Sequence, residues 1–216
     1  VDTLLVFGSN GRVYSIDVSL LPGGRGDGQP VTTLLELEVG TQLLYYFAGS
    51  AAATLLLSSS AGYGFMATVE NMVSRQKAGK AFVAVNTGET LCCPSLVSGA
   101  QGKVVTSGTP AALVAPATHV ACASTGGRIL TFEITELKAM SKGGRGLMLI
   151  DLEAKDSLAG AAAYTRSVRI DGIGRGAKER EETLEIRSLN NARALRGRKG
   201  KAADLGFKPN AVTRVE

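Results

Sequence analysis

The chain has 216 residues, 44% of them apolar and 20% charged, so we expect one large or two small domains with a buried core rather than a disordered chain. No apolar run approaches the roughly 18 residues that a membrane-spanning helix needs. The net charge of +5 is uneven, because residues 165–216 hold 13 Lys and Arg against 7 Asp and Glu, whereas residues 1–164 hold 11 against 12. The asymmetry favours a polyanionic partner such as nucleic acid, although a solvated basic tail is the alternative interpretation.

The chain starts without Met in a strand-like run, residues 1–6, and a secretory leader is not evident there. We therefore expect a piece of a longer cytoplasmic protein. Three segments then share one pattern, in which an apolar run meets a small polar cluster ending in glycine and a second run alternates apolar and polar residues: 4–16, 54–68 and 120–132. Asn10-Gly11 suits the positive φ of a type I′ turn, and Gly62 and Gly127 stand at the matching places. The pattern predicts three β-hairpins.

A basic, glycine-containing loop follows each hairpin at a matching distance, after a short segment that favours one or two helical turns. Arg25 lies 14 residues after Gly11, Lys77 lies 15 after Gly62, and Lys142 lies 15 after Gly127. An apolar segment that we expect to be a strand follows each loop, at 31–37, 81–85 and 147–152. Residues 99–116 interrupt the period and are interpreted as an insertion or a loose hairpin.

A fourth, less regular copy closes the chain. Its predicted strands are residues 167–170, 183–186, 204–207 and 211–215, with a basic loop at 196–201. The repeats therefore cover approximately 1–53, 54–115, 116–164 and 165–216 of a single domain, 1–216. Units of about four short strands indicate propeller-like blades, because one unit cannot bury its own apolar face. The predicted fold class is all-β, and the low aromatic content argues against kelch and WD blades.

Catalytic and metal-binding chemistry finds little support in the residues. Cys92, Cys93 and Cys122 lack zinc spacing and are expected to pack in the core, and a His119–Cys122 pair would lack a third, orienting group. Gly172-x-Gly174-x-Gly176 departs from the dinucleotide-binding spacing and precedes a charged segment. The Gly-Lys pairs are not followed by Ser or Thr, so a P-loop is not predicted.

Residues 60–81, 127–146 and 11–30 resemble the C-terminal domain of the A subunits of bacterial type IIA topoisomerases, and most closely that of topoisomerase IV. The likeness is good over residues 1–155 and looser afterwards. It implies a β-pinwheel, a propeller-like ring of four-stranded blades that exchange strands, with about four to five blades here. It also implies that an N-terminal blade and the catalytic domains of the parent protein lie outside this chain.

The resemblance further implies a DNA-binding module without sequence specificity. Such a module binds and bends a duplex and presents it to the ATP-dependent strand-passage core, which serves decatenation and supercoil relaxation in chromosome segregation. Residues 142–146 match only part of the seven-residue gyrase box, which speaks against a gyrase-type wrapping domain. That domain and a propeller-like protein-interaction scaffold without DNA binding remain the alternatives.

The chain alone is not expected to be an enzyme or to hold a cofactor or metal, since ATP and Mg²⁺ act in other domains of the parent topoisomerase. The implied partners are double-stranded DNA, the remainder of the parent polypeptide, and the separate ATPase polypeptide of the enzyme in an A2B2 heterotetramer; the fragment itself is expected to be monomeric. The expected location is cytoplasmic and nucleoid-associated, with peripheral membrane association of the parent enzyme left open.

The basic loops supply the predicted DNA contacts. Lys and Arg recurring on successive blades would neutralise phosphates, and glycine would let backbone N–H groups approach them. The predicted DNA-binding residues are Arg25, Arg75, Lys77, Lys80, Lys142, Arg145, Arg196, Arg198, Lys199 and Lys201.

Overall fold

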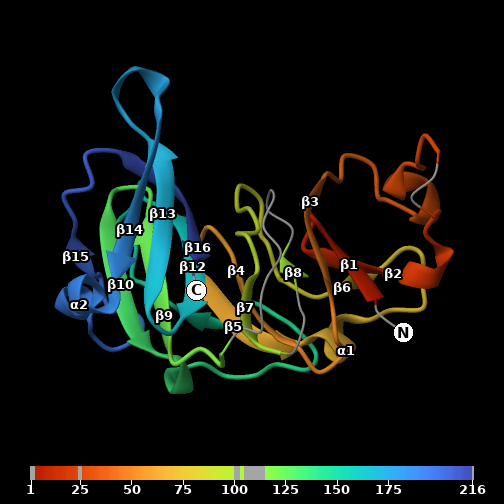
Figure 1. Ribbon diagram of the computed structural model, residues 1–216, viewed down its shortest axis with the longest axis horizontal. Coiled ribbons are helices and arrows are strands. Elements are labelled where there is room, and N and C mark those ends of the chain that lie inside the picture. Colours follow the sequence, from red (N-terminus) through yellow and green to blue (C-terminus); the bar gives the residue numbers. More distant parts are fainter. Residues whose placement is uncertain (1–2, 24–25, 100–102, 105–114, 216) are drawn as a thin grey trace.

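The computed structural model describes residues 3–23, 26–99, 103–104 and 115–215, with 103 and 104 as backbone only. Its strands form four sheets; in Figure 1 the first lies on the right, the second in the middle, and the third and fourth overlap on the left. Each sheet is built on one hairpin: β1 (Thr3–Gly8) with β2 (Arg12–Asp17), β4 (Thr54–Ser58) with β5 (Tyr63–Thr68), β9 (His119–Ser124) with β10 (Arg128–Glu133), and β13 (Ser167–Ile173) with β14 (Glu179–Glu185).

A third strand from the same unit pairs with the first strand of each hairpin. These strands are β3 (Leu43–Gly49), β7 (Ser95–Ser98), β12 (Leu158–Tyr164) and β16 (Lys208–Arg214), and β8 (Lys103–Val104) extends the first sheet beyond β3. On the opposite edge, the first three sheets each gain a two-residue strand from the next unit along the chain: β6 (Lys80–Ala81) on β2, β11 (Leu147–Met148) on β5, and β15 (Lys201–Ala202) on β10. We call these three the donor strands. The predicted all-β pinwheel with strand exchange is confirmed.

The turn glycines Gly11, Gly62 and Gly127 occupy equivalent places, as predicted. Their φ angles are +74°, +82° and +83°, which an L side chain rarely adopts. Each glycine carbonyl also accepts a hydrogen bond from a residue that lies just after a donor strand: Val83, Leu149 and Ala203, at 2.9, 2.7 and 2.9 Å. The turn that closes one hairpin therefore also fastens the next unit.

Successive side chains of an inner strand pack alternately against the sheet before it and the sheet after it, because side chains along a strand point to opposite faces in turn. In β4, Leu55 and Leu57 pack with Phe7 of the first sheet, whereas Leu56 packs with Cys122 of the third. In β9, Ala121 and Ala123 face the fourth sheet in the same way. Most of the core thus lies between sheets, which is why a single unit could not fold by itself.

Several segments differ from expectation. Residues 31–37 form the 3-10 helix η2 (Val31–Leu34) and a coil that cover the outer face of the first sheet, not a strand. Residues 204–207 lie outside any strand, and the insertion at 99–116 falls largely outside the described residues. The remaining helical pieces are short: η1 (Val18–Leu20), α1 (Val69–Met72), η3 (Ile134–Glu136), η4 (Arg175–Ala177), α2 (Ile186–Leu189) and η5 (Asn190–Ala192). A helix suited to crossing a membrane is not found in the described ranges.

Candidate nucleic-acid interface

The basic loops occupy the same structural position in three successive units. They are residues 74–79, 141–146 and 195–200, and each runs directly into a donor strand. Just before each loop, the chain contacts the middle of the second hairpin strand of the preceding sheet. Just after the loop, the donor strand pairs with the start of that same hairpin strand. Thus Met140 N donates to Met66 O before the second loop, and Leu147 pairs with Gly64 after it. The loops consequently lie on the sheet edge away from β3, β7 and β12.

Main-chain hydrogen bonds fix each loop against the unit before it. The carbonyls of Lys77, Gly144 and Arg198 stand at equivalent loop positions, and each accepts a backbone N–H, from Glu36, Ala84 and Asp151 at 3.0, 2.9 and 3.1 Å. The same hydrogen bond therefore orders each of the three loops, so their side chains are presented at equivalent places of successive units.

The loop glycines next to the donor strands have a packing role. Gly79, Gly146 and Gly200 have φ angles of +64°, +82° and +70°. An added Cβ would overlap a carbonyl oxygen of the preceding sheet in all three, at 2.8 Å for Gly79 and 2.6 Å for Gly200. These glycines are needed for strand exchange, which the sequence interpretation, with its emphasis on phosphate access, did not anticipate.

Six of the ten predicted DNA-binding residues have exposed side chains in these loops and at the start of the last donor strand. Within the described part of the chain none of the six forms an ion pair. We call them the rim cations: Arg75, Lys77, Lys142, Arg198, Lys199 and Lys201. A further predicted residue, Arg25, lies outside the described residues.

Three predicted residues instead make intramolecular contacts. Arg145 donates to both carboxylate oxygens of Glu89, at 2.8 and 3.2 Å, and its guanidinium lies 4.4 Å from the centre of the Tyr63 ring. The hydrogen bond from Arg145 lowers the pKa of Glu89. Lys80 donates to Asn71 O at 2.6 Å, and Arg196 donates to the main-chain oxygens of Glu136 and Met148. These cations hold one unit to another or order their own loop.

Two arginines that sequence reasoning missed hold the loops from the other side. Arg12 donates to Ala78 O at 2.9 Å and to Gly79 O at 3.2 Å, and it pairs with Glu38 at 3.3 Å. Arg128 donates to Gly200 O at 3.4 Å and pairs with Glu153 at 2.9 Å. Both directly follow a hairpin glycine, so the shared Gly-Arg step was the signal that could have identified them.

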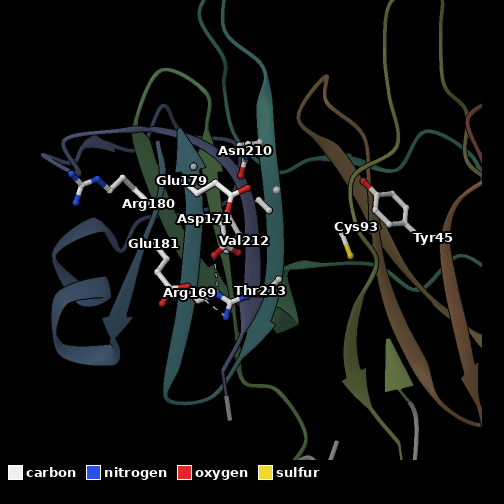
Figure 2. Close-up of a pocket in the computed structure, with 14 residues that line it drawn as sticks. Tyr45, Cys93, Arg169, Asp171, Glu179, Arg180, Glu181, Asn210, Val212 and Thr213 are labelled. Atoms are coloured by element: carbon white, nitrogen blue, oxygen red, sulfur yellow. Dashed lines mark ion pairs between the residues drawn. The ribbon is translucent and has the colours of Figure 1, made fainter. Parts of the chain in front are cut away.

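Burial keeps the three cysteines and Tyr45 in their protonated forms. Burial raises the pKa of Cys92 to about 11 and of Cys93 to about 12, and it raises the pKa of Cys122 further. An open groove of about 570 Å³ lies between Tyr45 and Cys93 on one side and the fourth sheet on the other (Figure 2). Burial also raises the pKa of Tyr45 to about 12, so this groove presents a neutral phenol and thiol rather than a nucleophile.

Known proteins resemble the chain in sequence and in fold. The family described as "DNA gyrase C-terminal domain, beta-propeller" matches residues 2–36 and 118–164. The A subunit of DNA topoisomerase 4 from Neisseria gonorrhoeae is 36% identical over 192 residues, 88% of this chain and 23% of the relative. The protein of the same name from Haemophilus influenzae is 31% identical over 205 residues, which are 94% of this chain and 25% of that relative. The chain thus spans about a quarter of the length of these relatives.

Solved structures agree with these relatives. The E. coli ParC C-terminal domain matches with a TM-score of 0.78 at 26% identity, covering 98% of this chain and 80% of that one. The DNA gyrase A C-terminal domain matches with a TM-score of 0.66 over 100% of this chain and 66% of that one, and at 16% identity it shows the shared fold alone. The resemblance drawn from the residues is confirmed.

Proposed function

Because the chain belongs to the family of DNA gyrase C-terminal domains, we propose that it is a DNA-binding module whose rim cations hold a duplex without reading its sequence. The observation that carries this proposal is the recurrence of exposed, unpaired Lys and Arg at equivalent, hydrogen-bonded loop positions of successive units. Cations in such a series neutralise phosphates and release counterions, which provides affinity that depends on salt and not on base sequence.

The helices support binding without sequence readout. In the described ranges the longest helices, α1, α2 and η2, have four residues each, too short to lie in a major groove and read base edges. Discrimination would therefore come from the shape and deformability of the duplex. Contacts on several successive units would favour a bent duplex wherever bending lets more phosphates reach the protein.

In the parent enzyme, this module would present a duplex to the ATP-dependent strand-passage core for decatenation and supercoil relaxation. The rest of the parent polypeptide and the separate ATPase polypeptide would supply the catalytic residues and bind ATP and Mg²⁺. This chain alone would therefore cleave no DNA. The assembled enzyme would act on chromosomal DNA. Topoisomerase IV is favoured over gyrase because residues 142–146 match only part of the gyrase box. Within this partial match, the Arg145 side chain is bound to Glu89.

A salt series tests the proposal. We expect Lys77→Ala, Lys142→Ala and Arg198→Ala together to weaken binding equally on unrelated duplexes and to lower the slope of log affinity against log salt by about one per lost phosphate contact. The matched control removes three exposed charges outside the loops, by Lys155→Ala, Arg187→Ala and Lys208→Ala. Equal slopes for wild type and the loop variant would refute the proposal.

A further inference from the structure

The β13–β14 hairpin differs from the other three in length and in direction. Its two strands have seven residues each and its turn spans five, Gly174–Lys178, whereas the other hairpins have strands of five or six residues and shorter turns. In Figure 1 it projects beyond the sheets at the top of the view, whereas α1, which precedes the first basic loop, lies at the bottom. The turn contains Gly174 and Gly176, the last two glycines of the segment that superficially resembles a dinucleotide loop, whereas Gly172 lies in β13.

The hairpin tip, residues 174–180, carries a net positive charge, with three cations against the one carboxylate of Glu179. Arg175, Lys178 and Arg180 are exposed, and none of the three forms an ion pair among the described residues. Ala177 has φ +56° and is the one described residue other than glycine with a positive φ. Gly176, at φ +72°, precedes it, so this turn holds a backbone conformation that costs an L residue free energy.

The strands of the hairpin below the tip differ from it in charge. Arg169 pairs with Asp171 at 2.9 Å and with Glu181 at 3.8 Å, so the cation in this strand pair is already neutralised (Figure 2). Arg180 points away from this group in the same view. The acidic residues that follow along β14, Glu181, Glu182 and Glu185, would repel phosphates, so a polyanion could approach only the tip.

We infer that the hairpin tip is a second contact for duplex DNA, separate from the rim cations. The tip stands at the far end of β14 from α2, roughly 23 Å along the strand at about 3.3 Å per residue. Gly174, Gly176 and Ala177 let phosphate oxygens approach the backbone, whereas the tip has no aromatic anchor of the kind that dominates protein interfaces. Figure 1 shows the tip at the top of the view and α1 and α2, which precede the first and the last basic loop, well below it, so the two surfaces suit two duplex segments held at once.

This inference rests on the proposed function, and a bridging assay separates the two. The 216-residue chain is loaded onto an immobilised duplex, and capture of a labelled second duplex of unrelated sequence is measured. Wild type should retain both duplexes. Arg175→Ala with Lys178→Ala should keep the first duplex but lose most of the second, with a fall of about two in the salt slope of the capture step. Lys155→Ala with Arg187→Ala is the matched control.

Each outcome decides between the two claims. Failure of wild type to bind the immobilised duplex contradicts the proposed function itself. Binding of the first duplex with equal capture of the second by the tip variant and the control overturns the inference about the tip. A tip-dependent interaction with polyglutamate but not with the second duplex would assign the surface to an acidic protein segment, and would also overturn it.

Discussion

Arg145 of the third unit reaches the preceding unit and donates hydrogen bonds to both carboxylate oxygens of Glu89, at 2.8 and 3.2 Å. Two parallel bonds of this kind fix geometry as well as charge. In the first and third sheets the equivalent anchoring contacts come from Arg12 and Arg128, which reach in the opposite direction along the chain. Each basic loop is thus anchored by at least one arginine, the last one by both Arg128 and Arg196, and the anchoring residues are distinct from the cations left exposed beside them.

Anchoring and DNA binding should separate experimentally at two positions three residues apart. Lys142→Ala should reduce DNA affinity with a change in stability of at most ~1 kcal/mol, because the side chain is exposed and unpaired. Arg145→Ala should lower both the DNA affinity and the free energy of unfolding, since it leaves Glu89 without its partner and frees the loop. Urea unfolding together with DNA titration checks this, and Arg145→Ala with wild-type stability would contradict it.

The Glu89–Arg145 pair should make stability depend on pH. The pKa of Glu89 is lowered from 4.5 by the hydrogen bond from Arg145, so the pair stabilises the fold above the unfolded-state pKa, and this contribution is lost as pH falls through the folded-state pKa. The stability difference between wild type and Glu89→Gln should therefore be largest at neutral pH and shrink below about pH 4. Urea midpoints measured from about pH 7 to about pH 3 test this, and a difference independent of pH would exclude the pair as its source.

Gly79→Ala should weaken strand exchange. The new Cβ would lie 2.8 Å from Val13 O and 2.6 Å from the Tyr14 ring, at a φ of +64°. Gly88→Ala is the control, because its φ of +84° is equally strained but nothing lies within 4 Å of the added carbon. The control should cost about 1–2 kcal/mol and Gly79→Ala clearly more. Equal losses in the unfolding free energy would mean that the close approach of β6 to β2 is unimportant.

The three cysteines should resist alkylation in the folded protein. Burial raises the pKa values of Cys92 and Cys93 to about 11 and about 12, so little thiolate exists near pH 8. Cys122 is fully buried, whereas Cys93 is only partly buried. Thiol titration at about pH 8 should be slow without denaturant and complete in urea. Rapid reaction of one native thiol would place that cysteine in a more open environment.

The sequence predicted the local elements well and the contacts between units poorly. Gly11, Gly62 and Gly127 mark the hairpins because their positive φ is a local requirement. The pairing of Lys80 with Val13 depends on residues far apart in the chain, so periodicity cannot indicate it. For the same reason, composition could not distinguish the exposed Lys142 from the paired Arg145: a nearby carboxylate of another unit makes the difference.

The donor strands make neighbouring units interdependent during unfolding. Loss of residues 201–202 would leave β10 with an uncovered edge, and loss of 147–148 would do the same to β5. An exposed edge of this type invites pairing with other chains. Shortening the array by one unit therefore damages the unit that remains, and we expect the sheets to unfold as one cooperative block whose truncated forms aggregate.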